Sequence, residues 1–334
     1  MTDPTRPAGD PSATDGDSGP PSLSTFSLEG RAVPALYLIG WIGCVMGLGI
    51  LVVSLMATSS SAAPWLFLAG LVLLGVGLVS AAGSQAVEGA RRLDRPYRGP
   101  SPVIAFLAVV VVTLLAILVV VAPLTALGLD ARSPLATAVS LAVTALAYVA
   151  IVRLLVVGPG SLTWADMGLG LPASAIVRDL ALGAVLAVPV LAVTEVLGLL
   201  LSRVLTPAPS VLPNSGDALG LALNLLSAAV IAPIGEELFF RGFATTAWSR
   251  AIGAGPAIVR GAAFFALAHV LTLMDATFAE GAQRAIYSFI ALLPAGLALG
   301  WVFLRRRSLY AAIGLHAAFN ALQVVALFVA GTRV

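Results

Sequence analysis

The chain has 334 residues, of which 59% are hydrophobic and 10% charged, and its formal net charge is +2. Soluble domains carry about 25% charged residues, so this composition excludes a soluble enzyme, a fibrous protein and a fully disordered chain. The 18 basic residues are all arginines and lie scattered along the chain. This distribution does not predict a nucleic-acid partner.

Residues 1–30 are rich in Pro, Ser, Gly, Asp and Thr. They predict a disordered N-terminal tail, because they hold too little apolar surface to order themselves. Apolar runs then follow one another to the end of the chain, most of them near the length of about 20 residues that spans a bilayer. The runs fall near 34–57, 63–82, 102–127, 134–156, 177–204, 218–243, 257–274, 283–304 and 308–330.

Each apolar run is expected to be a helix, because backbone groups in lipid must be hydrogen-bonded within their own segment. The sequence thus predicts an all-α polytopic membrane protein with about eight to nine transmembrane helices. Four helices are expected within residues 31–156, a linker at 157–176, and a second transmembrane domain at 177–331.

The arginines predict the orientation, because cytoplasmic loops of membrane proteins are rich in Lys and Arg. With the N-terminus in the cytoplasm, fourteen of the 18 arginines fall on inner segments and four on outer ones. The outer ones are Arg132, Arg203, Arg284 and Arg333. We therefore expect a multi-pass protein of the cell membrane with a cytoplasmic N-terminus, and the lipid bilayer as its first partner.

Polar residues inside the apolar runs are the candidates for function, because an ionisable group at the bilayer centre costs about 2.5–3.5 kcal/mol on insertion scales. They concentrate in the last hundred residues: Glu236, Glu237, Arg241, His269, His316 and Asn320. Counting 1.5 Å per residue along each predicted helix places them at a similar depth, nearer the cytosolic side. We expect one shared, water-accessible site that includes the only 2 histidines of the chain.

The spacing of these residues indicates which of them share a helix face. Glu237 and Arg241 are four residues apart with the acid first, which is the favoured order of a helical ion pair. Glu236 is turned about 100° from Glu237, so it can point elsewhere and serve as a general base. His316 and Asn320 are also four residues apart and share a face.

Three further residues in the apolar runs have expected roles. Phe265 lies one turn before His269 and is expected to form a wall of the site. Pro233 is expected to kink its helix and free backbone carbonyls for water. Glu195, a buried acid in the fifth run, has no evident partner in the sequence, so we expect a structural role for it.

Three patterns lie in order on separate predicted helices: Glu236–Glu237–x–x–x–Arg241, Phe265–x–x–x–His269 and His316–x–x–x–Asn320. Together they resemble the three motifs of the CAAX protease and bacteriocin-processing (CPBP, Abi) family of intramembrane peptidases, which includes the Ras-converting prenyl-protein endopeptidase. The resemblance covers roughly residues 224–325. It implies a helical fold around a cytosol-facing cavity and a catalytic, CAAX-protease-like domain at 177–331.

The resemblance also implies roles for the residues. Glu236, assisted by His269, would activate water, and His316 and Asn320 would stabilise the oxyanion. Glu237 and Arg241 would orient Glu236 and His269. The substrate would be a peptide or protein that is lipidated or membrane-anchored.

Two mechanisms stay open. The family is often described as a metalloprotease family, and Glu236, His269 and His316 could supply three ligands to a catalytic zinc ion with water in the fourth position. A metal-free mechanism would use the same glutamate as general base.

Two other functions also stay open. One is a non-catalytic membrane binder or bacteriocin self-immunity protein on the same scaffold. The other is a proton-coupled transporter in which Glu236 and the histidines relay protons. The endopeptidase is favoured because a proton relay does not need an Asn one turn after a His, whereas an oxyanion site uses one.

Overall fold

The computed structural model describes residues 34–56, 60–91, 96–208, 213, 217–270 and 278–331. The predicted disordered tail at residues 1–30 lies outside these ranges. Within them the chain is helical and has no strand, which confirms the predicted fold class. In the described part of the chain, eight helices are long and apolar enough to cross a membrane, and a ninth, Ala254–Val270, is apolar but shorter.

Each helical rod coincides with one predicted run, although the second and the sixth rods each extend nine residues further than predicted. They are α1 (Pro34–Met56), α2 (Ala63–Arg91), α3 (Pro102–Ala126), α4 (Pro134–Val152) continued by η1 (Arg153–Val157), α5 (Ala173–Leu201), α9 (Ala254–Val270), α10 (Phe278–Arg306) and α11 (Leu309–Gly331). The remaining rod is composite: α6 (Ala218–Leu225), η2 (Leu226–Ile231), α7 (Ala232–Glu237), η3 (Leu238–Thr245) and α8 (Thr246–Ile252).

Local sequence signals set several rod ends. The Ser133 hydroxyl accepts the Ala136 N–H at the start of α4, and the Asp217 carboxylate accepts the Gly220 N–H at the start of α6. Both side chains satisfy amides that have no partner within the helix. Gly253 ends α8 with φ of 87°, a backbone conformation that glycine adopts at little cost.

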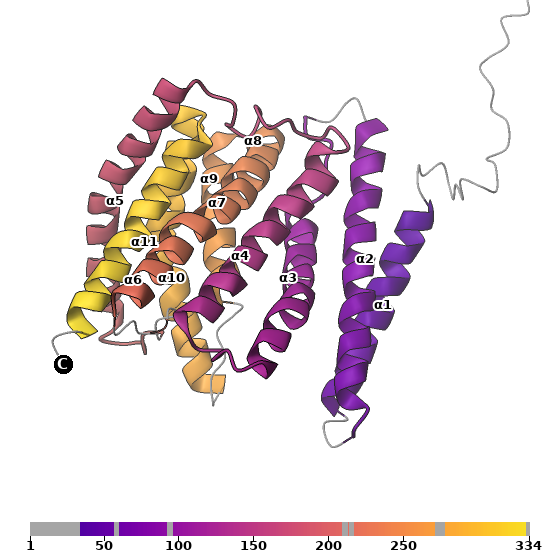
Figure 1. The fold of residues 1–334 in the computed structure, drawn as a ribbon. Helices are drawn as coiled ribbons and strands as arrows, with labels where there is room; N and C mark the ends of the chain where they lie inside the picture. Colours follow the sequence, from indigo (N-terminus) through magenta and orange to yellow (C-terminus); the bar gives the residue numbers. More distant parts are fainter. Residues whose placement is uncertain are drawn as a thin grey trace, which may run out of the picture.

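Successive rods run in alternating directions through one bundle (Figure 1). The α1–α2 pair forms one flank and α5 with α11 the other, with α3 and α4 between them. α1 and α2 approach closely at Gly43 and Gly77, where a Cβ on Gly43 would lie 2.7 Å from the Gly77 Cα. This contact requires residues without side chains, as is common between membrane helices.

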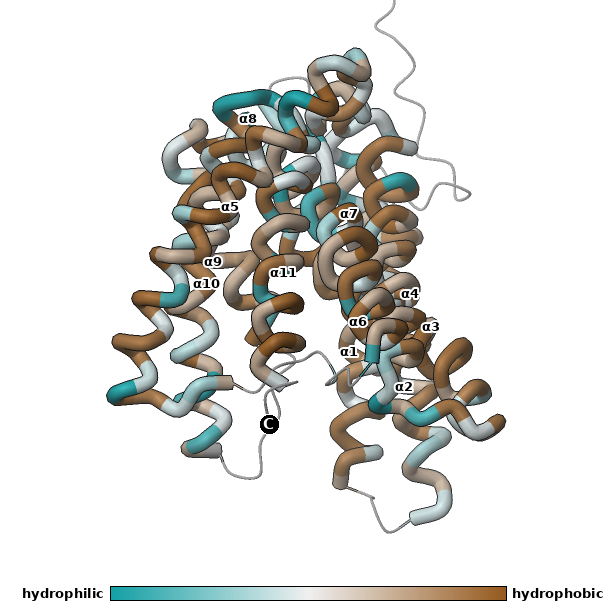
Figure 2. Tube along the Cα trace, turned by 60° about the vertical axis from the view of Figure 1, so that its left-hand side comes forward, coloured by the Kyte–Doolittle hydropathy of each residue, from teal (hydrophilic) through white to brown (hydrophobic). Residues whose placement is uncertain are grey.

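The helices are hydrophobic along most of their length (Figure 2). Large hydrophobic side chains such as Trp41, Leu146 and Val185 are exposed. A contiguous apolar exterior of this extent is expected where lipid, rather than water, is the solvent. The protein is therefore a multi-pass membrane protein.

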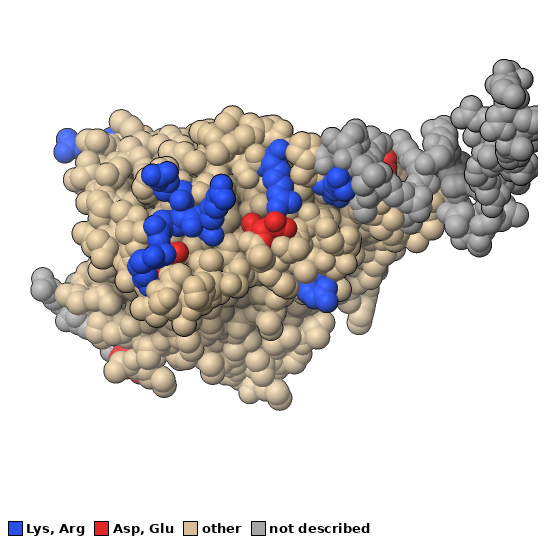
Figure 3. All heavy atoms as spheres, turned by 90° about the horizontal axis from the view of Figure 1, so that it is seen from above, with Lys and Arg blue, Asp and Glu red and all other residues tan. Residues whose placement is uncertain are grey.

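One end of the bundle carries most of the charge. Figure 3 views the bundle from the top of Figure 1 and shows the basic side chains gathered on that face. Among the described residues, the arginines at rod ends on this side are Arg98, Arg153, Arg178, Arg250, Arg260, Arg305, Arg306 and Arg307. Below, this face is called the arginine-rich end.

The loop 158–172 closes part of the arginine-rich end. Its Leu162 and Met167 side chains are buried, and the Gly168 carbonyl accepts the N–H of Leu309 at 3.1 Å. Asp166 pairs with Arg250 at the end of α8. The loop therefore covers the core that lies above the polar residues of α7, α9 and α11.

The hydrophobic core crosses the predicted boundary at 157–176. Phe106 of α3 and Tyr148 of α4 pack against Phe239 and Phe240 of η3, with ring centroids 5.1–6.0 Å apart. These rings hold the composite rod against the N-terminal helices.

Candidate active site

Glu236, His269 and His316 converge from three separate rods, α7, α9 and α11. The Oε2 atom of Glu236 lies 3.8 Å from Nε2 of His269 and 3.9 Å from Nε2 of His316. The side chains are 18%, 36% and 7% exposed respectively. The group is therefore mostly buried but keeps one accessible flank, on the side of His269.

Each histidine is held through its Nδ1 atom. Nδ1 of His269 lies 2.8 Å from the carbonyl oxygen of Phe265, and Nδ1 of His316 lies 2.8 Å from Oε1 of Glu237. A carbonyl and a carboxylate oxygen only accept, so in both rings Nδ1 carries the proton and donates. In the neutral form, each Nε2 therefore presents a lone pair toward Glu236.

Glu237 forms the expected pair with Arg241 and adds a second contact. Its Oε1 atom accepts from Nη1 of Arg241 at 2.8 Å as well as from His316. Both charged side chains are buried, and the Arg241 guanidinium stacks on the Phe265 ring at 4.2 Å. A buried charge needs a counter-ion and hydrogen bonds, so Glu237 links the position of His316 to that of Arg241.

Phe265 forms a wall of the site. Its ring centroid lies 4.4 Å from that of His269 and 5.7 Å from that of His316. One aromatic ring thus contacts both imidazoles and the guanidinium, and it limits how far each of them can rotate.

Asn320 reaches the same rod at a carbonyl that the helix leaves open. The Ala232 N–H bonds to Ser227 in the wider turn of η2, and Pro233 has no N–H to donate. The Ala228 carbonyl accepts instead from Nδ2 of Asn320 at 2.7 Å. Pro233 therefore does free a carbonyl, but a side chain rather than water meets it.

With both imidazoles neutral, the three atoms that face one another at the centre of the site are all acceptors. Oε2 of Glu236 is buried without a hydrogen-bond partner among the described residues. At 3.8–3.9 Å from each Nε2, it is too far for a direct hydrogen bond. The separation suits a water molecule that bonds to the carboxylate and to an imidazole at once.

The same donors are the types that zinc prefers, two imidazoles and one carboxylate. Their spacing fits less well, because two ligands of a tetrahedral zinc ion lie about 3.4 Å apart. Among the described residues, no group of three or more His, Cys, Asp or Glu side chains could hold a metal ion as arranged. Zinc binding would therefore require the side chains to move closer together.

Helix α4 packs against the rod that carries Glu236, and its apolar run gave no prediction of this contact. Gly235 packs against Ala145, and a Cβ on Gly235 would lie 2.7 Å from the Ala145 Cα. One turn further along α4, Tyr148 packs on Phe239 and interacts electrostatically with Glu236. A tyrosine in an apolar run was the available signal, because its hydroxyl needs a polar neighbour when buried.

Glu195 does have a partner, although the sequence did not indicate one. Its Oε1 atom lies 3.4 Å from Nε2 of Gln323 on α11. Glu195 is exposed and Gln323 partly so. Both lie outside the group around Glu236.

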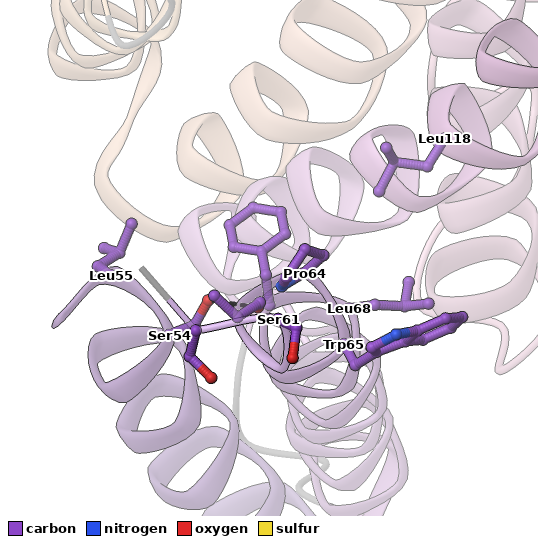
Figure 4. A pocket seen from close by; sticks show the side chains of 10 residues that line it. Ser54, Leu55, Ser61, Pro64, Trp65, Leu68 and Leu118 are labelled. Carbon is purple, nitrogen blue, oxygen red and sulfur yellow. Dashed lines mark hydrogen bonds between the residues drawn. The ribbon is translucent and has the colours of Figure 1, made fainter. Parts of the chain in front are cut away.

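A separate cavity of about 570 Å³ lies far from these residues, between the ends of α1, α2 and α3 (Figure 4). Its lining includes Ser54, Trp65 and Leu118 and contains no ionisable side chain. Because hydrolytic chemistry needs groups that can move protons, this cavity is not the candidate active site.

Comparison with known proteins finds one matching family. Residues 218–322 match the family model "Type II CAAX prenyl endopeptidase Rce1-like". No curated protein and no solved structure matches the chain significantly. The matched segment runs from the start of α6 into α11 and includes every residue of the group around Glu236. Over residues 218–322, the chain is therefore similar to the Rce1-like type II CAAX prenyl endopeptidases.

Proposed function

We propose that the protein is an intramembrane endopeptidase that uses Glu236 as general base. The observation that supports this most directly is the approach of the Glu236 carboxylate to both imidazoles, at 3.8 and 3.9 Å. A water between them would lose a proton to Glu236 as its oxygen attacks the peptide carbonyl carbon. The same proton then passes to the leaving nitrogen as the C–N bond breaks.

The remaining residues position the attacking water and stabilise the oxyanion. His269, fixed by the Phe265 carbonyl, accepts a hydrogen bond from the attacking water. His316 stabilises the tetrahedral oxyanion as an imidazolium, because its Nδ1 proton is committed to Glu237 and only a second proton on Nε2 can be donated. Asn320 has a second N–H on the amide that bonds Ala228, and this N–H donates to the same oxyanion.

The orientation of the protein follows from its charges. The arginine-rich end is the cytosolic one and the N-terminus is cytoplasmic, in agreement with the positive-inside rule. His316 lies seven residues from the start of α11 at that end, a depth of about 10 Å. Cleavage would then occur in the cytosolic half of the membrane, on a peptide or protein that is lipidated or membrane-anchored.

The experiment compares membranes from cells that contain the wild-type protein or Glu236→Gln. Quantitative proteomics should show peptides that accumulate intact in Glu236→Gln and are cut in the wild type. Glu88→Gln, an acid on α2 outside residues 218–322, is the matched control and should behave as wild type. Equal peptide profiles for the wild type and Glu236→Gln would refute the catalytic role and favour a non-catalytic binder.

A further inference from the structure

A line of polar side chains continues from the catalytic group toward the end of the bundle opposite the arginines. On α11, His316, Asn320 and Gln323 follow one another at i, i+4 and i+7. At 100° per residue, they lie within about 60° of one another on the helix surface. Because His316 and Asn320 both face the composite rod, Gln323 lies on the same side of α11.

Two neighbouring helices add to this line. Glu195 of α5 contacts the Gln323 amide at 3.4 Å. Three residues further along α5, the Tyr287 hydroxyl of α10 lies where a Cβ on Gly198 would meet it at 2.9 Å. Tyr287 also interacts electrostatically with Glu195. We call Asn320, Gln323, Glu195 and Tyr287 the polar stripe.

The residues around the active site are more deeply buried toward the arginine-rich end than toward the polar stripe. Toward the arginine-rich end, Glu237 and Arg241 are fully buried, and so is Met167 of the loop 158–172 that closes this end. In the other direction, Gln323 and Tyr287 are partly exposed and Glu195 is exposed. A chain that reaches Glu236 thus has open, polar surface on the side of the stripe and packed core on the other.

The chemistry of the stripe suits one kind of occupant. A peptide bond can be cut only where the substrate is extended, and an extended backbone in a membrane leaves N–H and C=O groups that cost several kcal/mol each if unpaired. A carboxylate, two amides and a phenol provide both acceptors and donors. Leaving the same groups against lipid would itself be costly.

Resting on the proposed function, we infer that the polar stripe binds the extended backbone of a membrane-embedded segment of the substrate. Gln323 lies seven residues beyond His316, about 10 Å along the helix axis. An extended peptide rises about 3.3 Å per residue. Gln323 and Glu195 therefore meet the substrate about three residues from the bond that is cut.

The first test asks whether the polar stripe is hydrated. It does not depend on peptide cleavage. In full-length protein with Cys44→Ser, in liposomes, Gln323→Cys should react with a quaternary-ammonium methanethiosulfonate reagent applied on both sides. Leu322→Cys is the matched control, because Leu322 is exposed but points about 120° away from His316. It should stay unreactive in lipid. Equal reaction of the two cysteines, or none at Gln323→Cys, would overturn the inference.

The second test uses capped apolar peptides that extend two or five residues to either side of the cleaved bond. Gln323→Leu should lower kcat/KM about tenfold for the peptides that extend five residues on the side of the cleaved bond that lies along the polar stripe. This is the loss expected for one or two hydrogen bonds. The two-residue peptides should be cut equally by the variant and the wild type. An equal loss for all lengths would overturn the inference. If the wild type cuts no peptide, the proposed function fails, while the labelling result stands by itself.

Discussion

Removing the charge of Glu237 should destabilise the fold more than removing the charge of Glu236. In Glu237→Gln, the side chain keeps its shape and its amide oxygen can still accept, so the variant isolates the negative charge. Arg241 would remain fully buried beside the Phe265 ring at 4.2 Å and the Gly296 carbonyl at 3.5 Å, with a neutral amide in place of the carboxylate that balances its charge. Breaking a buried ion pair by removing one partner costs about 3–5 kcal/mol.

Glu236→Gln provides the contrast, because Oε2 of Glu236 has no hydrogen-bond partner among the described residues. We expect its free energy of unfolding to stay within about 0.5 kcal/mol of wild type, although cleavage is lost. The measurement is reversible unfolding in mixed detergent micelles, followed by far-UV circular dichroism. The double variant Glu237→Gln/Arg241→Met should recover most of the loss, since an apolar replacement removes the unpaired charge. Equal stability of Glu236→Gln and Glu237→Gln would refute the description of Glu237 as the counter-ion of a buried cation.

Four further outcomes are expected. Asn320→Leu should lower kcat about 10²–10³-fold, the usual effect of losing one oxyanion donor, and an unchanged kcat would remove Asn320 from the mechanism. Gly235→Val should destabilise the protein by about 1–3 kcal/mol, because its side chain would meet the Ala145 backbone; calorimetry would detect this, and wild-type stability would contradict the close contact. Burial alone raises the pKa of Asp166, but hydrogen bonds from Thr163 and Arg250 hold it below its ordinary value. This carboxylate therefore stabilises the fold above about pH 4, and the contribution disappears as the pH falls through the lowered pKa. The free energy of unfolding of Asp166→Asn should therefore be about 0.2–1 kcal/mol lower than that of the wild type near neutral pH. The two values should converge in strong acid. Purified protein should contain far less than one zinc per chain by mass spectrometry of the metal, and one tightly held zinc per chain would support the metal-dependent mechanism instead.

The helical rods were predictable from sequence because a single chain segment in lipid has few alternatives to a helix. A long apolar run in a membrane has to bond its own backbone, so the apolar runs predicted about eight to nine helices and most of their ends. The i, i+4 pairing of Glu237 with Arg241 was equally local and is present at 2.8 Å. Features that depend on one residue and its immediate neighbours could thus be anticipated.

Contacts between distant segments were not predictable in this way. Nothing in the spacing of Asn320 indicates that its partner is the Ala228 carbonyl, because that carbonyl is open only through the wide turn of η2 and the missing N–H of Pro233. The approach of Tyr148 to Glu236 depends on the close packing of Gly235 on Ala145, which neither run shows alone. The contact of Glu195 with Gln323 likewise joins residues 128 positions apart.

The packing of α4 against the composite rod has a consequence for expressing shorter versions of the protein. A fragment cut at residue 218 would keep all the groups around Glu236 but lose Tyr148 and Ala145, and with them the surface that Phe239 and Gly235 press against. Detergent or lipid would then contact the surface of the composite rod that α4 covers in the full protein. A minimal functional fragment should therefore begin upstream of Pro134, well before the segment that sequence comparison alone would suggest.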